Sequence, residues 1–561
     1  MKSIAVIAAT TDWTTTEWDA IVVGAGTAGI IVADRLSEAG MSTLLLELGG
    51  VSYGVTGGRE RPDWLQGTDL SRVDVPGLYK SIFSGGSPLL CPSDVVSAFQ
   101  ACTIGGNSAI NAGLYFQPPA DDWDSYFPEG WHSKDVQPAI SRLLARQPAV
   151  TAYSQDNKYY LQSGYNAARE WLVGAAGFTN VSMSAEPNKK DRVFGRPVYN
   201  YIGGQRGGPT RTYLQSALKR SNFHLQTGAR VKHIIQNKGT ASGVVVTVNG
   251  KDTTVKIKAN GKVVLSAGAI LSPKILMYSG IGPADVLNKL AQASHTPYTS
   301  KSWVVNSAVG NGLFDNPNTF IELSSPSVQA YTQSYSNPVP QDRDLFLSKR
   351  SGPYTFASQT SVFWGYVPHS DGTKTGVQGT IDSSGYSGFT NGNTITLNVY
   401  GTSGLLSAGR VVLSDDGKFT AGPSSDVYYT HERDAKDIAT FIHSIFQALP
   451  KSTPQSPAKN GLTPLNIPQS STVAEIQKYI TTPSAYAVGQ VQHWSSSCRI
   501  GSCVDKDTKV IGTKNIHVID ASILSPLTVN PQFGVMVAAE KGTERILASR
   551  AQIKASINIS I

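Results

Sequence analysis

The chain has 561 residues, a formal net charge of +8 and 16% charged residues, and it is rich in glycine (54) and proline (30). This composition excludes a largely disordered protein, and a chain of this length predicts more than one domain-sized unit. Lysine and arginine are scattered, with no basic run that carries interleaved aromatic residues, so we expect no nucleic-acid partner. No segment approaches the ~20 apolar residues of a membrane-spanning helix, so we expect no membrane partner.

The first residues of the chain hint at a secretory signal. Residues 1–9 read Met-Lys-Ser-Ile-Ala-Val-Ile-Ala-Ala. The apolar run in them is shorter than the ~7–15 residues of a signal's hydrophobic region. We therefore expect residues 1–18 to be an N-terminal arm or the remnant of a signal.

A glycine-rich turn between two short strands is the strongest motif of the chain. An apolar strand at residues 20–23 runs directly into Gly24, Gly26 and Gly29. A helical pattern follows, and a second strand ends on Glu47. This order of strand, G-x-G-x-x-G turn, helix, strand and acid is typical of a βαβ unit that binds a dinucleotide.

Each residue type in this unit suits a dinucleotide. Gly24 permits the tight turn, Gly26 lets the backbone approach a pyrophosphate, and Gly29 lets helix and strand pack closely. Free N–H groups at the start of the helix bind phosphate oxygens, and Glu47 can accept hydrogen bonds from ribose hydroxyl groups. The alternative, a glycine-rich turn in an ordinary βαβ unit, would not need the acid.

The segments that follow are expected to surround the ligand. Residues 51–100 are rich in glycine, proline and serine, which predicts long loops that cross it. The segment 101–115 is rich in small residues, as where backbone lies against a flat ligand. Residues 135–175 then show helical periodicity.

Two patterns between residues 223 and 280 combine strands and a helix. Residues 223–266 alternate polar and apolar side chains, and Asn249-Gly250 marks a hairpin turn. At residues 266–280 a strand end leads into a helix, and we expect Pro273 near the first turn of that helix.

From about residue 310 to residue 490 the chain is dominated by serine, threonine, tyrosine and glycine. Extended alternation recurs there, which predicts an antiparallel sheet in a separate substrate domain. A helix is expected next, before the chain returns to an α/β pattern. The segments concerned are 361–366, 394–400 and 410–413 for the sheet, 435–449 for the helix, and 516–520 and 535–548 for the final strand and helix.

Four cysteines form two local pairs, Cys91 with Cys102 and Cys498 with Cys503. An even number of cysteines in close pairs suits disulfide bonds in an oxidising compartment. A zinc site is the alternative, but no C-x-x-C or histidine-rich spacing supports it, so we expect no metal site.

Two N-glycosylation sequons, like the paired cysteines, indicate secretion. The triplets that begin at Asn180 and Asn558 are acceptors for N-glycosylation. We therefore expect a secreted, extracellular glycoprotein.

Three further segments resemble signature motifs of the glucose–methanol–choline (GMC) oxidoreductases. Residues 101–124 resemble the first signature, and residues 268–282 match the second throughout. Residues 515–540 resemble the family's C-terminal flavin and active-site segment. Together with the glycine-rich turn, these motifs extend the resemblance over the chain from Asp19 onward.

This resemblance implies the fold class. We expect an α/β FAD-binding domain, Rossmann-like and of the GMC type, that is split in sequence, and an α+β substrate domain with a large antiparallel sheet. The expected parts are FAD-binding segments at 19–135, 216–310 and 491–561, and substrate segments at 136–215 and 311–490.

Within the family, the chain is most similar to the flavodehydrogenase domain of fungal cellobiose dehydrogenase, and we expect no counterpart of that enzyme's cytochrome domain. The likeness implies oxidation of the C1 hydroxyl of an aldose or oligosaccharide to a lactone. Electrons would pass to a quinone, a metal complex or a redox partner protein. The residues that carry this likeness lie at 191–195, 206–209, 212–215, 493–494 and 530–532, with the cysteine pair at 91 and 102.

The family resemblance also implies the cofactor, FAD, and the residues that bind it. Some relatives attach FAD covalently through a histidine just before the position of Asn111. Ile110 occupies that position here, so we predict noncovalent FAD. Val231 is expected to offer its backbone to the adenine. The expected FAD-binding residues are Gly24, Gly26, Gly29, Glu47, Gly106, Asn111, Gly113, Leu114, Val231, Asp520 and Ala521.

Two residues match the catalytic pair of the family, His493 and Asn530. The implied reaction is hydride transfer from a carbinol C–H to flavin N5, with His493 as the base and Asn530 as a hydrogen-bonding partner of the hydroxyl. A neutral imidazole suits this role because its pKa lies near working pH. Taken alone, His493 would more often be structural, and Asn530-Pro531 a turn.

The substrate residues are less like those of cellobiose dehydrogenases. Val491 and Gln492 precede the base where those enzymes carry Ser-Asn, and Asp382 falls near a sugar-contacting arginine, which reverses the charge. We expect Gln492, Trp494 and Asp382 to contact the substrate. The alternatives are an aryl or aliphatic alcohol oxidase that uses O₂, and a hydroxynitrile-lyase-like FAD protein. The Cys498–Cys503 pair would either hold the backbone after the base or act as a surface staple.

Overall fold

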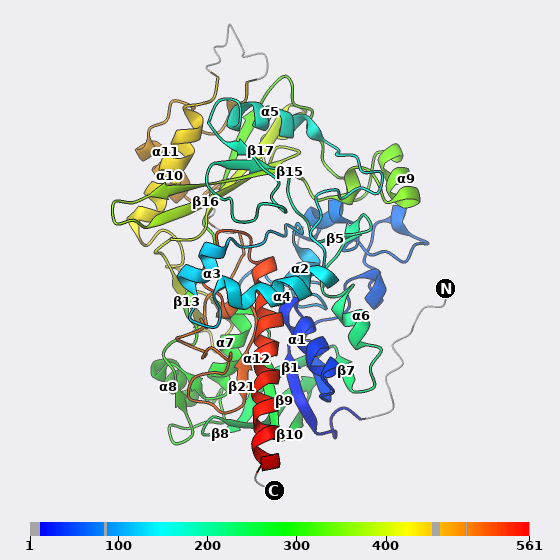
Figure 1. Ribbon diagram of the computed structural model, residues 1–561, viewed down its shortest axis with the longest axis vertical. Helices are drawn as coiled ribbons and strands as arrows, with labels where there is room; N and C mark the ends of the chain where they lie inside the picture. The colour runs from blue at the N-terminus through cyan, green and yellow to red at the C-terminus, as the bar shows by residue number, and fades with distance from the viewer. Residues whose placement is uncertain (1–11, 84–86, 451–460, 488, 490, 560–561) are drawn as a thin grey trace.

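The computed structural model describes residues 12–83, 87–450, 461–487, 489 and 491–559. Residues 1–11 of the expected N-terminal arm and Ser560 of the second sequon lie outside this range. Figure 1 shows two halves along the long axis of the molecule. The lower half contains a mixed sheet beside the long C-terminal helix, and the upper half contains an antiparallel sheet covered by helices.

The lower sheet carries the predicted βαβ unit. Its strand order is β7 (Phe223–Gln226), β2 (Thr43–Leu46), β1 (Trp18–Val23), β10 (Lys251–Leu265), β9 (Thr240–Val248) and β8 (Ala229–Asn237), and β21 (Ile516–Val518) pairs with β10. The pairs β7–β2, β2–β1, β1–β10 and β10–β21 are parallel. The side chains of Ile21, Val22 and Val264 are fully buried, as expected for parallel strands covered on both faces.

Strand β10 takes part in two kinds of pairing. Its first residues pair antiparallel with β9 across the predicted hairpin turn, where Asn249 and Gly250 have φ of 50° and 76°. Positive φ at both positions is what a type I′ hairpin turn requires. The last residues of β10 lie between β1 and β21 and pair with both in parallel.

Helices pack around this sheet. They are α1 (Thr27–Glu38), α4 (Ser133–Arg146), α6 (Tyr213–Ala217), α7 (Gly268–Tyr278) and α12 (Gln532–Ile559). Within the range 136–215, expected to be the first substrate segment, α4 and α6 share the apolar core of the lower sheet. The hydroxyl of Tyr213 in α6 donates to buried Glu540 of α12 at 2.8 Å, which joins these helices.

The structure corrects the expected place of Pro273. Helix α7 begins at Gly268, so Pro273 lies in the helix interior and not near the first turn. Proline has no N–H to donate to the carbonyl of Ala269, four residues earlier. The hydroxyl of Ser497 donates to that carbonyl oxygen instead.

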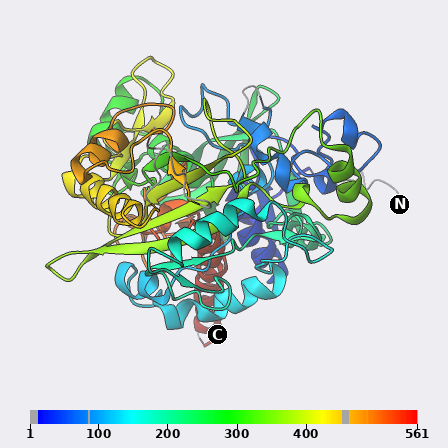
Figure 2. The same ribbon diagram turned by 90° about the horizontal axis from the view of Figure 1, so that it is seen from above.

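The upper sheet is antiparallel except at one edge, where β3 and β4 pair in parallel. Its order is β20 (Thr463–Pro464), β14 (Asn318–Ser324), β17 (Thr394–Gly401), β16 (Lys374–Asp382), β15 (Gln359–Pro368), β4 (Val193–Gly195) and β3 (Thr179–Asn180). Three helices cover one face, α5 (Gln162–Leu172), α10 (Glu432–Phe446) and α11 (Val473–Thr481) (Figures 1 and 2).

Alternation along these strands separates an apolar face from a polar one. Ile321 lies opposite Leu397 in the register, and both are buried in the core beneath the covering helices. The next pair, Phe320 and Asn398, faces the other side of the sheet and lines a cavity. Because side chains of a strand point alternately to opposite faces, the cavity-lining residues of β14 and β17, such as Phe320 and Asn398, are available to a ligand.

Two parts of the sheet prediction need correction. Segment 410–413 does form a strand, β18 (Gly409–Leu413), but it pairs with β13 (Asn311–Leu313) and β19 (Ala421–Pro423) in a separate sheet. Val411 and Leu413 belong to the core of the lower half, which explains this placement. Strand β16 was not predicted because glycines interrupt its pattern, and Gly379 makes room for Phe363, whose ring a Cβ there would approach to 2.0 Å.

The remaining described segments are mostly loops with short helices. The expected loops of residues 51–100 contain three 3₁₀ helices, η1 (Gly54–Thr56), η2 (Asp63–Leu65) and η3 (Pro76–Phe83). Two short helices follow, α2 (Asn107–Ile110) and α3 (Ala120–Tyr126). Helical periodicity over 135–175 corresponds to α4 and α5, with a non-helical stretch between them.

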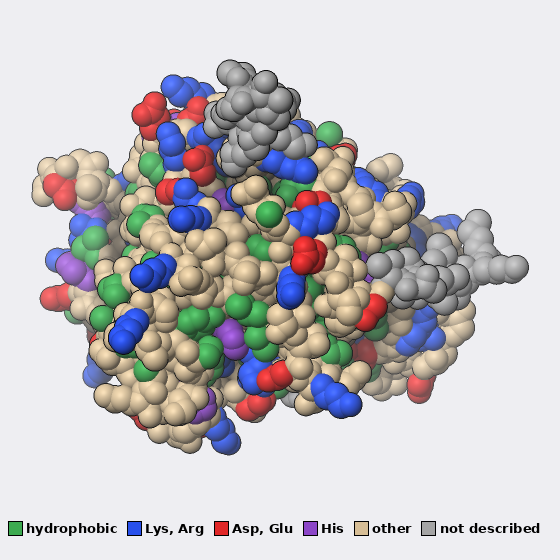
Figure 3. Space-filling model, turned by 90° about the horizontal axis from the view of Figure 1, so that it is seen from below, with side chains coloured by type: hydrophobic (Ala, Val, Ile, Leu, Met, Phe, Trp, Pro, Cys, Tyr) green, Lys and Arg blue, Asp and Glu red, His purple; other side chains and the backbone are tan. Residues whose placement is uncertain are grey.

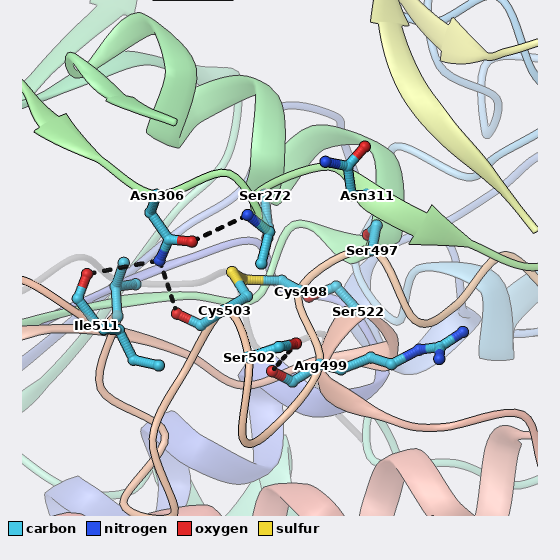
Figure 4. The surroundings of a disulfide bond; sticks show 12 residues. Ser272, Asn306, Asn311, Ser497, Cys498, Arg499, Ser502, Cys503, Ile511 and Ser522 are labelled. Atoms are coloured by element: carbon cyan, nitrogen blue, oxygen red, sulfur yellow. Dashed lines mark hydrogen bonds between the residues drawn. A yellow bond between two sulfur atoms is a disulfide. The ribbon is translucent and has the colours of Figure 1, made fainter. Parts of the chain in front are cut away.

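Both predicted disulfides, Cys91–Cys102 and Cys498–Cys503, are present, so these sulfurs are not zinc ligands. Figure 4 shows the second bond near Asn306, whose side-chain amide donates to the carbonyl of Cys503 at 3.1 Å. Cys498 and Cys503 are fully buried, so the alternative of a surface staple is wrong.

The surface and the helices bear on the kinds of partner the protein can bind. On the face shown in Figure 3, basic and acidic side chains are interspersed. Among the residues that the structure describes, no helix combines the length and the apolar character needed to cross a membrane. Asn180 of the first sequon is exposed at the end of the edge strand β3.

Candidate active site

A cavity of about 1520 Å³ is lined by residues of both halves. This volume exceeds the roughly 300–1,000 Å³ of most small-molecule pockets, and it leaves room for a dinucleotide together with a substrate. All residues that we expected at the cofactor, the base or the substrate line this cavity, except Gly29.

Glycines form the floor of the cavity where β1 meets α1. A Cβ at Gly24, which has φ of 102°, would lie 2.5 Å from the carbonyl oxygen of Ser266, and a Cβ at Gly106 would lie 2.8 Å from the Cα of Gly26. At Gly29 a Cβ would lie 1.9 Å from the carbonyl oxygen of Gly24, which is why this glycine lies behind the cavity wall. Backbone therefore forms the surface at the N-terminus of α1, a geometry that suits a pyrophosphate.

Glu47 follows β2 at the edge of this floor. Its two carboxylate oxygens accept hydrogen bonds from the N–H groups of Ala25 (2.8 Å) and Gly49 (2.9 Å). Burial raises the pKa of Glu47. A carboxylate oxygen has two lone-pair sites, so both oxygens keep acceptor capacity for a ribose hydroxyl group.

The loop around Asn111 forms another wall. The side-chain oxygen of Asn111 accepts from the N–H of Gly113 (2.9 Å) and from Arg206 (3.0 Å), and its amide donates to Gln532. Within the described chain, Gln532 Nε2 and Trp494 Nε1 are buried donors without a partner. Unpaired donors on the cavity wall fit a cofactor that carries acceptor atoms, as FAD does.

Both carboxylate oxygens of Asp520 accept hydrogen bonds from groups of the protein. One carboxylate oxygen accepts from the N–H of Gly268 (2.9 Å) and the hydroxyl of Ser272 (2.6 Å), and the other accepts from the N–H and hydroxyl of Ser522. Asp520 thus ties the start of α7 to the end of β21. Asp520 and Ala521 line the cavity, and their contact with FAD stays a prediction, as does that of Val231 with the adenine.

His493 and Asn530 come together across 37 positions of sequence. The Nε2 of His493 lies 3.4 Å from the side-chain nitrogen of Asn530, and its Nδ1 lies 2.9 Å from the side-chain oxygen of Asn316. Asn530 accepts from Gln378 of β16 at 2.7 Å and from Tyr400 of β17 at 3.4 Å. Burial lowers the pKa of His493 to about 3, so the imidazole is neutral at ordinary pH.

A buried carboxylate holds the backbone of this histidine. Asp315 accepts from the N–H groups of Gln492 (2.9 Å) and His493 (2.6 Å) and from the hydroxyl of Tyr428 (2.5 Å). Burial raises the pKa of Asp315 to about 6. Sequence reasoning missed Asp315, Asn316, Gln378 and Tyr400, because nothing in the sequence places these segments next to residue 493.

Asp382 has a cation as its partner. Its carboxylate accepts from Lys80 Nζ (2.7 Å), Ser358 Oγ (3.0 Å) and Gln359 Nε2 (2.9 Å). Both Lys80 and Asp382 line the cavity, and nothing in the sequence around Lys80 points to this role. Trp494 also lines it, although only 5% of this residue is exposed and most of it packs in the core.

The wall opposite the cofactor floor carries acceptors without donors. Within the described residues, the side-chain oxygens of Asn318, Gln359 and Asn398 are buried and have no hydrogen-bond partner. All three residues line the cavity. A buried acceptor without a partner costs about 1–3 kcal/mol, so these atoms favour a ligand with several donors.

The fold and the site define a dinucleotide-dependent oxidoreductase whose cavity is shared by a cofactor-binding half and a substrate-binding half. The chain belongs to the GMC oxidoreductase family. The model of the family's N-terminal domain matches residues 19–318, and that of its C-terminal domain matches residues 406–539. The protein is therefore an FAD-dependent oxidoreductase that acts on CH–OH donors.

Several known proteins are similar over nearly the whole chain. Choline oxidase of Arthrobacter globiformis is 27% identical over 570 residues, which cover 95% of each chain. A formate oxidase structure of Aspergillus oryzae is 18% identical, with a TM-score of 0.73 over 96% of this chain and 99% of that one. A fungal aryl-alcohol oxidase is 16% identical, with a TM-score of 0.66 over 95% and 99%. At these identities the two structures show the shared fold alone.

Proposed function

We propose that the protein oxidises a carbohydrate hydroxyl group, at C1 of an aldose or oligosaccharide, to a lactone. The observation that carries this proposal is the neutral His493 beside Asn530 on the wall of the cofactor cavity. Bound FAD, held noncovalently, supplies the two-electron acceptor for the C–H bond. His493 accepts the hydroxyl proton, and Asn530 donates a hydrogen bond that orients the hydroxyl oxygen.

The polar wall supports a substrate with many hydroxyl groups. The unpaired oxygens of Asn318, Gln359 and Asn398 need several donors at once, which a sugar supplies and a simple alcohol does not. Gln378 contacts Asn530, and Asp382 lies four residues further along the same strand. At about 3.3 Å per residue this wall extends roughly 13 Å from the catalytic pair, longer than one sugar ring.

A second candidate is oxidation of an aryl alcohol with O₂. Aromatic side chains gather at the cavity, where the ring of Phe83 packs at a tilt against Phe99 (ring centroids 5.1 Å apart) and that of Phe320 against Tyr386 (5.1 Å). Such rings suit an aromatic substrate as well as the face of a sugar. The similarity to a fungal aryl-alcohol oxidase fits this alternative.

The proposed enzyme also needs an electron acceptor and a cellular compartment. We place the electron acceptor among quinones, metal complexes and redox proteins, as the likeness to cellobiose dehydrogenase implies. Two disulfides and an exposed sequon at Asn180 support a secreted glycoprotein.

Anaerobic flavin bleaching tests the proposal. The holoenzyme is mixed with cellobiose, lactose, glucose or an aryl alcohol, and the flavin absorbance is followed. Fast bleaching by a sugar is the expected result, and readmission of O₂ then separates an oxidase from a dehydrogenase. Bleaching by the alcohol alone would favour the second candidate. His493→Ala should slow the bleaching by about 10²–10⁴-fold, and the same rate in this variant would contradict its role as base.

A further inference from the structure

The imidazole of His493 lies between two carboxamides whose orientations are set by other groups. Asn316 donates its side-chain N–H to the carbonyl of Gly401 at 2.7 Å, so its oxygen faces His493 Nδ1. Asn530 accepts from Gln378 through its oxygen, so its nitrogen faces His493 Nε2. All donors of this chain of hydrogen bonds point the same way, from β16 toward the carbonyl in β17.

This direction determines which ring nitrogen carries the proton. A carboxamide oxygen only accepts, so the contact with Asn316 requires N–H at Nδ1. A neutral imidazole has a single N–H, which leaves the lone pair on Nε2, at the side of Asn530 and the cavity. We propose that Asn316 is a positioning residue that makes Nε2 of His493 the proton acceptor, and that Asp315 holds the backbone of that base. The inference rests on the proposed function of His493.

Asp315 contributes through the backbone. Gln492 has φ of 67°, in the left-handed region that non-glycine residues rarely adopt. The carboxylate of Asp315 accepts from the N–H of Gln492 itself at 2.9 Å and from the N–H of the next residue, His493, at 2.6 Å. These two bonds stabilise a backbone conformation that is otherwise strained, and they direct the side chain of His493 toward Asn530.

The neutral partner at Nδ1 affects the charge state of the imidazole of His493. The titratable groups that face His493 in the described chain are Asp315, bonded to its backbone, Tyr400, whose ring lies edge-on at 6.1 Å, and Tyr428, which donates to Asp315. Asn316 adds no negative charge to this set. The resting imidazole therefore stays unprotonated, and its lone pair is free to take the hydroxyl proton when the hydride leaves the substrate carbon.

Two substitutions separate the orientation of the ring from its charge. Asn316→Leu removes the acceptor at Nδ1, so flavin reduction should slow by about 10- to 100-fold. Asn316→Asp keeps an acceptor and adds a negative charge, which favours imidazolium. The pH below which flavin reduction slows should then rise by about 1–3 pH units. Asn311→Asp, at an exposed position five residues earlier, makes the same chemical change and should leave the pH profile unaltered.

Nitrogen NMR of the oxidised holoenzyme tests the tautomer without any substrate. With ¹⁵N-labelled histidine, the signals of His493 are those missing in His493→Gln. We expect a protonated Nδ1 and a lone-pair Nε2 in the parent protein, and loss of this single tautomer in Asn316→Leu. The opposite tautomer in the parent protein would overturn the inference, and so would unchanged rates and pH profiles in both Asn316 variants. If no sugar or alcohol reduces the flavin, the proposed function fails, but the spectrum still decides the tautomer.

Discussion

The ammonium group of Lys80 lies 2.7 Å from the carboxylate of Asp382, and this ion pair joins η3 to the end of β16 at the wall of the substrate cavity. The charge reversal noted at Asp382 in the sequence is thus compensated by a cation from a segment 302 residues away. The carboxylate does not face the ligand unpaired, which favours a neutral substrate over a cationic one.

Removing this cation should change the charge preference of the cavity. In Lys80→Met, Asp382 keeps only neutral donors, so we expect KM for a sugar substrate to rise by about tenfold. Binding of a cationic alcohol such as choline should strengthen by a similar factor, because an unpaired carboxylate attracts it. Anaerobic flavin reduction with both substrates measures this change. Lys436→Met, at an exposed position of α10, is the matched control, and equal behaviour of the two variants would refute the expectation.

Buried Asp122 should make stability depend on pH. Its carboxylate accepts from the N–H (2.8 Å) and hydroxyl (2.6 Å) of Thr528, two residues before Asn530, and burial raises its pKa to about 7. Because the folded state binds this proton more tightly than the unfolded state, its contribution is full below pH ~4 and is lost as the pH rises to about 7. Across this window the parent protein should lose about 2–4 kcal/mol of its free energy of unfolding through this group. Asp122→Asn should not show this loss.

Denaturant unfolding of the holoenzyme at several pH values measures this difference. Asp121→Asn, the exposed neighbour, serves as the control and should keep most of the pH dependence of the parent protein, because burial and not the charge of Asp121 is the largest cause of the raised pKa of Asp122. Parallel curves for Asp122→Asn and the parent protein between pH 4 and pH 7 would show that Asp122 does not titrate there.

The buried disulfide five residues after the base should matter for activity more than for stability. Cys498 donates its N–H to the carbonyl of Ser522 at 2.8 Å, so the Cys498–Cys503 ring connects the base to the segment of Asp520. A loop this short contributes only about 2 kcal/mol of chain entropy. We expect Cys498→Ala with Cys503→Ala to lower stability by about this amount and to slow flavin reduction several-fold.

The Cys91–Cys102 disulfide offers an internal comparison for this experiment. Replacing Cys91 and Cys102 by alanine removes a bond of longer sequence separation, 11 against 5, and should cost slightly more stability. If both double variants slow flavin reduction equally, the Cys498–Cys503 bond has no special effect on the base.

Gly29 should be required for the cofactor site although it does not line the cavity. A Cβ there would lie 1.9 Å from the carbonyl oxygen of Gly24, so Gly29→Ala must push α1 away from the turn that faces the pyrophosphate. We expect at least a tenfold loss of FAD affinity, measured by flavin fluorescence on dilution. Gly50→Ala is the control, because a Cβ at Gly50 meets no atom within 4 Å and its φ is not positive. Equal affinities in the two variants would contradict this expectation.

Local patterns were enough to predict the cofactor half. The G-x-G-x-x-G turn, the hairpin at Asn249-Gly250 and the buried strand at residues 20–23 depend on neighbouring residues, and all three are present. The position of Pro273 and the sheet that contains residues 410–413 were predicted wrongly. In both cases a distant part of the chain determines the local structure. The hydroxyl of Ser497 bonds the carbonyl that Pro273 leaves unpaired, and residues 410–413 pack into the core of the lower half.

Motifs of neighbouring residues in the sequence identify the family and the cofactor, and the resemblance to that family implies His493 as the base. The tertiary structure alone decided what surrounds the base. Asn316 reaches His493 from 177 residues away, and Lys80 reaches Asp382 from 302. Such pairs form because packed sheets bring remote strand ends to one cavity, and side-chain direction, orientation of a carboxamide and pairing of a charge exist only after that packing.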